Sequence, residues 1–154
     1  MEMADLITRD AILPAVRATG IKRFFQEIGV RAGGAYGLDP RVVVEGLLTR
    51  EKLGSTAIGG GVAIPHARLA GLASYVGLFA RLETLVDFEA ADGQWVDLVF
   101  VILTPKKSNT EHLRILARVS RLFSNSDLRE KLRDTSEAPA LYVLITEPTA
   151  YQVA

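Results

Sequence analysis

The chain contains two histidines, and the surroundings of His66 suggest chemistry. His66 directly follows Pro65 at the end of a short apolar run, and three consecutive glycines, Gly59, Gly60 and Gly61, lie upstream. Proline fixes its own φ angle and biases the preceding residue toward extended geometry, so we expect the ring of His66 to leave a strand end in a defined direction. A glycine-rich turn can point several N–H groups at an anion such as phosphate, although a flexible hairpin turn is the commoner reason for such a run. Residues 50–66 are therefore the candidate functional stretch.

The motifs of this stretch also occur together in a known family. Three segments together resemble the active-site signature of enzyme IIA of the bacterial phosphotransferase system, fructose/mannitol type. They are Leu-Gly-Ser-Thr at residues 53–56, the three glycines, and Ile-Pro-His-Ala-Arg-Leu at residues 64–69. Within that family the resemblance is closest to the nitrogen-regulatory branch. It continues through residues 86–88, 92–94, 96–103 and 111–113, and so covers nearly the whole chain. One departure is Ala67-Arg68, where many relatives carry Gly-Lys, a change that keeps a small residue and a cation.

The resemblance implies roles for five residues. His66 is expected to accept a phosphoryl group from an HPr-type protein, forming tele-phosphohistidine, and His112 is expected to support it as the second active-site histidine. Arg50, Ser55 and Thr56 are expected at the phosphate site. From spacing alone, Arg50 is better read as a solvated helix end and Ser55 and Thr56 as the turn that follows it, and the residues themselves leave the phosphorylated nitrogen open.

The chemistry of these residue types agrees with that role. A neutral imidazole nitrogen is a suitable nucleophile for phosphoryl transfer between proteins, because it needs no strong base and its phosphoramidate can pass the group on. The transition state is loose, so cations and hydrogen-bond donors beside the nucleophile matter most. His112 lies on one helical stripe with Leu116, Val119 and Phe123, so it should point inward near a helix N-terminus, which disfavours the imidazolium form. By itself it would be read as a buried histidine bound to a backbone carbonyl.

Hydrophobic periodicity predicts an α/β fold with a mixed sheet between helices on both faces. We expect a helix capped by Thr19 with Phe24, Phe25 and Ile28 on its apolar face. A second should run from an Asp39 cap to Gly54, a third should start with a capping box of Ser108 and Glu111, and a short fourth should be capped by Ser126. Residues 75–82, 96–103 and 140–145 should be strands, residues 96–103 the central one, with a short edge element at residues 86–88.

Composition narrows the function classes. The chain of 154 residues fits a single domain, 1–154, and its 18 basic residues balance 18 acidic ones, so nothing points to nucleic acid or to membrane insertion. The absence of cysteine excludes disulfides and thiolate metal sites and fits a cytoplasmic protein. No spacing indicates a zinc site, and we expect neither a metal nor a cofactor. Asp87 and Asp92 are better interpreted as turn caps than as a catalytic pair. The helix face with Arg114, Arg118 and Arg121 is interpreted first as a solvated surface and second as a docking site for an acidic protein.

Two functions follow from the resemblance. The first is a phosphocarrier of the nitrogen-related phosphotransferase system whose phosphorylation state regulates partners such as kinases, transporters or nucleotide-signalling enzymes. The second is a free-standing IIA component that passes phosphate to a fructose/mannitol-type sugar permease. The lack of fused transporter segments favours the first.

Overall fold

The fold is built on one long buried strand, β6 (Val96–Pro105), in a computed structural model that describes residues 1–147. On one side β6 pairs antiparallel with β5 (Val76–Val86), and β5 pairs parallel with β1 (Ile7–Val16). On the other side β6 pairs parallel with two short strands in succession, β3 (Val62–Ala63) and β4 (His66–Leu69), and β2 (Ala57–Gly59) pairs antiparallel with β3. The near-continuous apolar run of β6 is thus explained by burial on both faces, which confirms it as a central strand.

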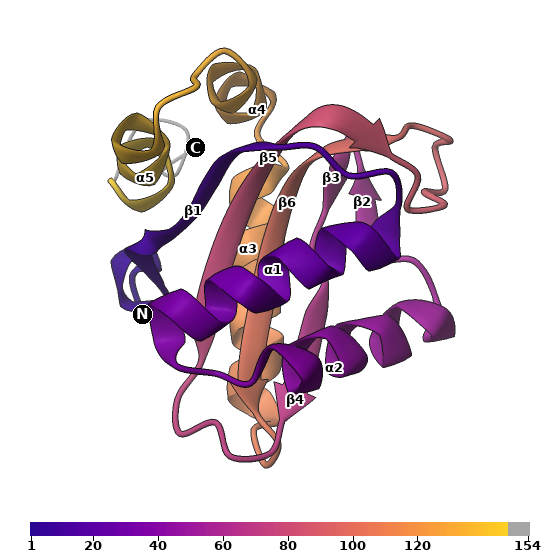
Figure 1. Ribbon diagram of the computed structural model, residues 1–154. Helices are drawn as coiled ribbons and strands as arrows, with labels where there is room; N and C mark the ends of the chain where they lie inside the picture. The colour runs from indigo at the N-terminus through magenta and orange to yellow at the C-terminus, as the bar shows by residue number, and fades with distance from the viewer. Residues whose placement is uncertain (148–154) are drawn as a thin grey trace.

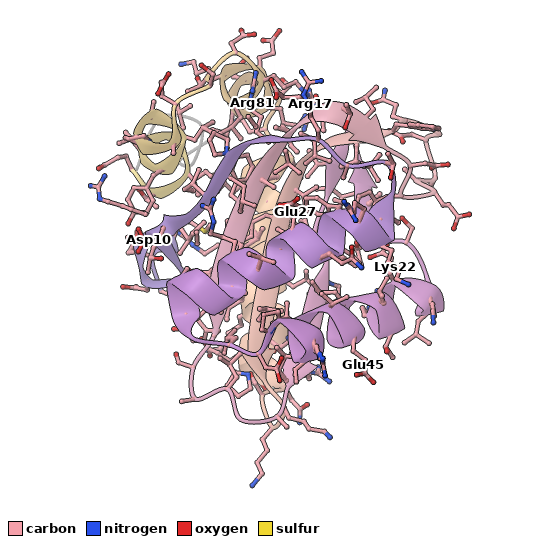
Figure 2. All side chains as sticks on the ribbon, viewed as in Figure 1. Asp10, Arg17, Lys22, Glu27, Glu45 and Arg81 are labelled. Atoms are coloured by element: carbon pink, nitrogen blue, oxygen red, sulfur yellow. The ribbon has the colours of Figure 1, made fainter. Side chains whose placement is uncertain are left out.

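Helices cover both faces of this mixed sheet (Figure 1). The helices α1 (Ile21–Tyr36) and α2 (Pro40–Leu53) lie on one face, and α3 (Thr110–Phe123) lies on the other. The short helices α4 (Ser126–Arg133) and α5 (Ala138–Thr146) follow, and α5 packs beside β1 and the 3-10 turn η1 (Met3–Asp5). Figure 2 shows Lys22 and Glu45 on the outward sides of α1 and α2, while apolar side chains of these helices turn to the sheet. The expected architecture is confirmed.

The helix starts were predicted correctly in one case and shifted in three. Asp39 caps α2 by accepting a hydrogen bond from the Arg41 amide, and Gly54 ends that helix, as expected. The N-cap of α1 is Gly20 instead of Thr19, that of α3 is Asn109 without a side-chain bond instead of Ser108, and that of α4 is Asn125 instead of Ser126. The two capping serines and the threonine were each chosen one residue away, because several polar residues precede each helix.

Three elements differ from the sequence expectation. Residues 140–145, expected as a strand, lie in helix α5, where Leu141 and Ile145 are buried four residues apart and Pro139 occupies the first turn. A short apolar run bounded by loops fits either element, so its β-forming residues misled the assignment. The strand β1 was not expected, because its burial does not alternate and Pro14 interrupts it. Residues 86–88, expected as a short edge element, do not form a separate strand. Val86 is the last residue of β5 and pairs with Val96, and residues 87 and 88 belong to the loop that follows.

Two side chains, Arg81 and Phe88, brace the end of the sheet opposite β4. Arg81 of β5 donates through Nε and Nη2 to the carbonyl of Arg133 and through Nη1 to that of Pro14, so it ties α4 to β1, as its position beside α4 in Figure 2 suggests. Phe88 packs against Phe24 and Phe25 with ring centroids 6.3 and 6.2 Å away. The contacts of Phe88 fix the loop after β5 against α1.

The approach of α2 to β4 predicts different results for two helical glycines. Alanine at Gly34 of α1 should stabilise the protein by about 0.5–1 kcal/mol, because its Cβ would meet nothing within 4 Å and alanine forms helix better. Alanine at Gly46 of α2 gains the same propensity but sets Cβ 2.8 Å from Leu69 Cδ2 and 3.3 Å from Ala67 Cβ, and this overpacking should cost about 1–3 kcal/mol. Urea denaturation of both variants measures the difference, and equal stabilities would contradict the close packing.

Candidate active site

The two histidines meet in a cavity of 580 Å³ between α2, β4 and α3. Its lining includes Arg50 from α2, His66 and Arg68 from β4, Lys106 after β6, and His112 from α3. In Figure 1, β4 lies next to α2 at the edge of the sheet, and the start of α3 approaches from the other face. Residues far apart in the sequence are thus brought together at one open edge.

His66 is fixed by its own backbone. It lies at a strand end, as expected, because it is the first residue of β4, and it pairs with Ile102 of β6. Its Nδ1 atom lies 2.8 Å from the carbonyl oxygen of Ile64. Because a carbonyl can only accept a hydrogen bond, Nδ1 of the neutral ring carries the proton and Nε2 keeps its lone pair.

The charge state of His66 follows from its surroundings. Burial lowers the pKa of His66 below its ordinary value, the bond to Ile64 partly opposes this, and the charges of Arg50 and Arg68 lower it further. The ring is therefore neutral at neutral pH. A half-buried neutral imidazole with a free Nε2 is a nucleophile.

His112 stands in the first turn of α3 and is only 5% exposed. Its Nδ1 atom lies 2.6 Å from Oγ1 of Thr104, and its ring centroid lies 5.4 Å from that of His66. Burial, then the charges of Arg68 and His66, lower the pKa of His112 to about 4. The expectation that His112 points inward as a neutral ring is confirmed, and its partner is a hydroxyl instead of a backbone carbonyl.

Two arginines supply positive charge to the cavity. Arg50 stands in the last turn of α2 and donates from Nη1 to the carbonyl of Gly54 at 2.8 Å. Arg68 lies two residues after His66 on the same strand, so both side chains project from one face of β4. From the sequence, Arg68 was noted only as a cation that replaces the lysine of many relatives, and no role at the site was predicted for it. The spacing of two within a strand is the signal that places it beside His66.

Ser55 and Thr56 do not line the cavity. The Ser55 hydroxyl donates to the carbonyl of Phe88 at 2.5 Å, and the Thr56 hydroxyl donates to the Glu51 carboxylate at 2.7 Å. The Thr56 amide donates to the same carboxylate at 2.8 Å. Thr56 therefore ties the loop after α2 to the end of that helix, next to Arg50, and Ser55 ties the same loop to the segment that follows β5.

The glycine run forms a hairpin turn between β2 and β3 at the beginning of β6. Gly59, Gly60 and Gly61 all have positive φ angles, as a turn of this kind requires. The Gly60 amide donates to Asp92, and the Gly60 carbonyl accepts from Arg133, which also pairs with Asp97. The turn adjoins residue 97 of β6, whereas His66 pairs at residue 102. The hairpin interpretation of the glycines is thus confirmed, and the turn lies away from the segment of β6 that pairs with His66.

The described part of the chain adds two negative findings. Residues 1–147 contain no group of three or more His, Cys, Asp or Glu side chains arranged to hold a metal ion. Among the same residues, no helix has the length and hydrophobicity needed to cross a membrane.

The fold matches that of a known class of protein. The structure is similar to the crystal structure of nitrogen regulatory protein IIA-Ntr from Neisseria meningitidis, with a TM-score of 0.87, 36% sequence identity, and coverage of 94% of this chain and 99% of that one. The α/β arrangement around the histidine pair is thus that of a IIA protein.

The sequence places the chain in a family. Residues 5–147 match the family model described as phosphoenolpyruvate-dependent sugar phosphotransferase system, EIIA 2, and the chain belongs to that family. It is 46% identical over 150 residues to the nitrogen regulatory protein of Bradyrhizobium diazoefficiens, covering 97% of this chain and 98% of the relative. It is 36% identical over 148 residues to that of Escherichia coli, covering 96% and 91%. These relatives support a regulatory protein related to the phosphotransferase system, and the family implies a phosphoryl-carrier role.

The burial of His112 predicts a loss of stability in mild acid. The unfolded chain binds a proton on this ring below its ordinary pKa of 6.5, whereas the folded chain binds it only near pH 4. Stability should therefore fall as the pH decreases through this window, by on the order of 2 kcal/mol between neutral pH and about pH 5. Urea denaturation of the wild type and of His112→Gln measures this, and the variant should show the shallower dependence. Equal dependence in both proteins would contradict a neutral buried His112.

Proposed function

We propose that this protein is a regulatory phosphocarrier of the nitrogen-related phosphotransferase system, in which His66 accepts a phosphoryl group from an HPr-type protein. The observation that carries the proposal is the 2.8 Å bond from His66 Nδ1 to Ile64, because it leaves the Nε2 lone pair as the reactive atom beside Arg50 and Arg68. The phosphorylated form would then be tele-phosphohistidine. Donors of this kind and the absence of cysteine fit a protein that works in the cytoplasm.

The proposed step is a direct transfer between two imidazoles. The lone pair of His66 Nε2 attacks the phosphorus of the donor phosphohistidine, the donor P–N bond breaks, and its electron pair returns to the donor ring. The new P–N bond makes the His66 ring cationic, since Nδ1 keeps its proton, and the Ile64 carbonyl stabilises that charge. The positive charges of Arg50 and Arg68 stabilise the negative charge on the equatorial oxygens of the transferring phosphoryl group. His112 stands close enough to contribute a hydrogen bond to them.

The remaining site residues act through position. Ser55 and Thr56 hold the loop that follows α2, and Thr56 binds Glu51, the neighbour of Arg50. Their part in the phosphate site, in this proposal, is to fix the end of α2 from which Arg50 reaches the cavity. They do not themselves contact the phosphoryl group.

His66→Ala should abolish phosphorylation, whereas His112→Ala should be phosphorylated about a hundredfold more slowly, because it loses only a positioned hydrogen-bonding group. The measurement is intact mass after incubation with phosphoenolpyruvate and the donor proteins, with a time course for the rate. The wild type should gain one phosphoryl group that is labile in acid and stable in base. Phosphate retained by His66→Ala, in a protein with an unchanged melting temperature, would contradict the assignment.

The regulatory role rests on the chemistry of the cavity rim. Val42 and Leu53 of α2 and Leu113 of α3 line the cavity and are exposed by 42%, 81% and 62%. A partner that docks there through apolar and acidic groups would be repelled once His66 carries a phosphoryl group. Kinases, transporters and nucleotide-signalling enzymes are the classes of partner that we propose. The names of the relatives favour this role over transfer to a sugar permease.

The His66→Asp variant separates the two roles. For a regulatory protein, it should lose or exchange partners that the unphosphorylated wild type retains in a pull-down, because it places negative charge at the same position. His66→Asn is the matched control, since it is similar in size and uncharged, and it should retain the wild-type partners. The regulatory role is contradicted if deletion of the protein causes only the loss of uptake of one sugar while all three pull-downs are the same.

A further inference from the structure

Thr104 is a buried polar residue in the last part of β6, directly beneath the histidine pair. It is fully buried and pairs with Arg68 in the register between β4 and β6, two residues beyond the pairing of His66 with Ile102. Paired residues of neighbouring strands point to the same side of a sheet, so Thr104, His66 and Arg68 share one face. That face is the one covered by α3, since Thr104 Oγ1 lies 2.6 Å from His112 Nδ1.

The protons of this pair can be counted. Within residues 1–147 the Thr104 hydroxyl has one hydrogen-bond partner, His112 Nδ1, and His112 Nε2 has none. If Nδ1 carried the ring proton, it would donate to Thr104, and the hydroxyl proton would be buried without an acceptor. An unsatisfied buried donor is costly, whereas a hydroxyl that donates to a bare Nδ1 satisfies both atoms. The favoured arrangement therefore places the His112 proton on Nε2.

We propose that Thr104 is a positioning residue that holds His112 as the Nε2–H tautomer, so that His112 donates a hydrogen bond to the phosphoryl group on His66. This inference rests on the proposed function of His66. Thr104 itself lies too deep to touch the donor protein or the phosphoryl group, and it acts only through the ring of His112.

The two histidines are held in complementary states by two different partners. A backbone carbonyl, which can only accept, binds Nδ1 of His66 and leaves a lone pair on its Nε2. A hydroxyl, which can donate, binds Nδ1 of His112 and leaves a proton on its Nε2. His66 then presents the nucleophilic nitrogen, and His112 presents a hydrogen-bond donor for an oxygen of the phosphoryl group that His66 accepts. Burial and the neighbouring Arg68 keep His112 neutral, so its single ring proton stays in the place that Thr104 selects.

The first test needs no substitution. Nitrogen-15 NMR of the histidine rings in the unphosphorylated wild type, at neutral pH, reports which nitrogen of each ring carries the proton. We expect the proton on Nδ1 in His66 and on Nε2 in His112. A proton on Nδ1 of His112 overturns the proposal, whatever the protein does with phosphate.

The second test compares Thr104→Val, which keeps the shape and removes the hydroxyl, with Thr104→Ser, which keeps the hydroxyl. The valine variant should be phosphorylated about tenfold to a hundredfold more slowly, as when histidines at metal sites lose the group that orients them. Its KM for the donor should not change, because Thr104 is buried, and the serine variant should recover most of the rate. In Thr104→Val the Nδ1 resonance of His112 should shift, because its hydrogen bond is gone.

The outcomes separate this inference from the proposed function. An equal transfer rate in wild type and Thr104→Val, with both proteins folded by melting temperature, overturns the positioning role. The positioning role is also overturned if Thr104→Ser is phosphorylated slowly although its His112 ring shows the same tautomer as in the wild type. If the wild type takes up no phosphate, the proposed function fails, and the role of Thr104 in transfer fails with it, although the ring spectrum still reports the tautomer.

Discussion

The active cavity depends on a break in the hydrogen bonding along one edge of β6. The strands β3 and β4 follow that edge as two halves of a strand interrupted at Ile64 and Pro65. Pro65 has no N–H group, and its carbonyl accepts from the Ile102 amide, so the chain stays attached to β6. The carbonyl of Ile64 is left to bind Nδ1 of His66. The amide of Ile64 donates to Thr56 instead of β6, so this interruption supplies the backbone acceptor that sets the tautomer of the nucleophile.

The alternation of side chains along β4 then divides the work between the two faces of the sheet. Ala67 and Leu69 are buried and point to α2, which approaches closely at Gly46. His66 and Arg68 point to the opposite face, toward His112 of α3. Because β4 lies at the edge, the last turn of α2 can still bring Arg50 to the same opening. Packing on one face therefore fixes the position of a charge that acts on the other.

The sequence predicted those features whose causes are local. The Pro65-His66 motif, the cap at Asp39 and the apolar run of β6 each carry their signal within a few residues, and each was found where expected. The pairing of β1 with β5 and the helix of residues 138–146 depend on contacts with distant segments, so their local patterns were ambiguous. Thr104 was missed for a similar reason. It looks like an ordinary strand residue, and only the packing of α3 on β6 shows that its hydroxyl meets a histidine.

The charges around His66 discriminate between the two groups that can bind its Nε2 atom. A proton is positive, and burial together with Arg50 and Arg68 opposes it, which is why the pKa of His66 is lowered. A phosphoryl group is negative, so the same arginines favour it in the proposed reaction. Without those cations, burial would still suppress protonation, but it would disfavour the negative phosphoryl group as well. The combination of a buried ring with nearby arginines thus keeps the nucleophile free of protons and selects a negatively charged group in their place.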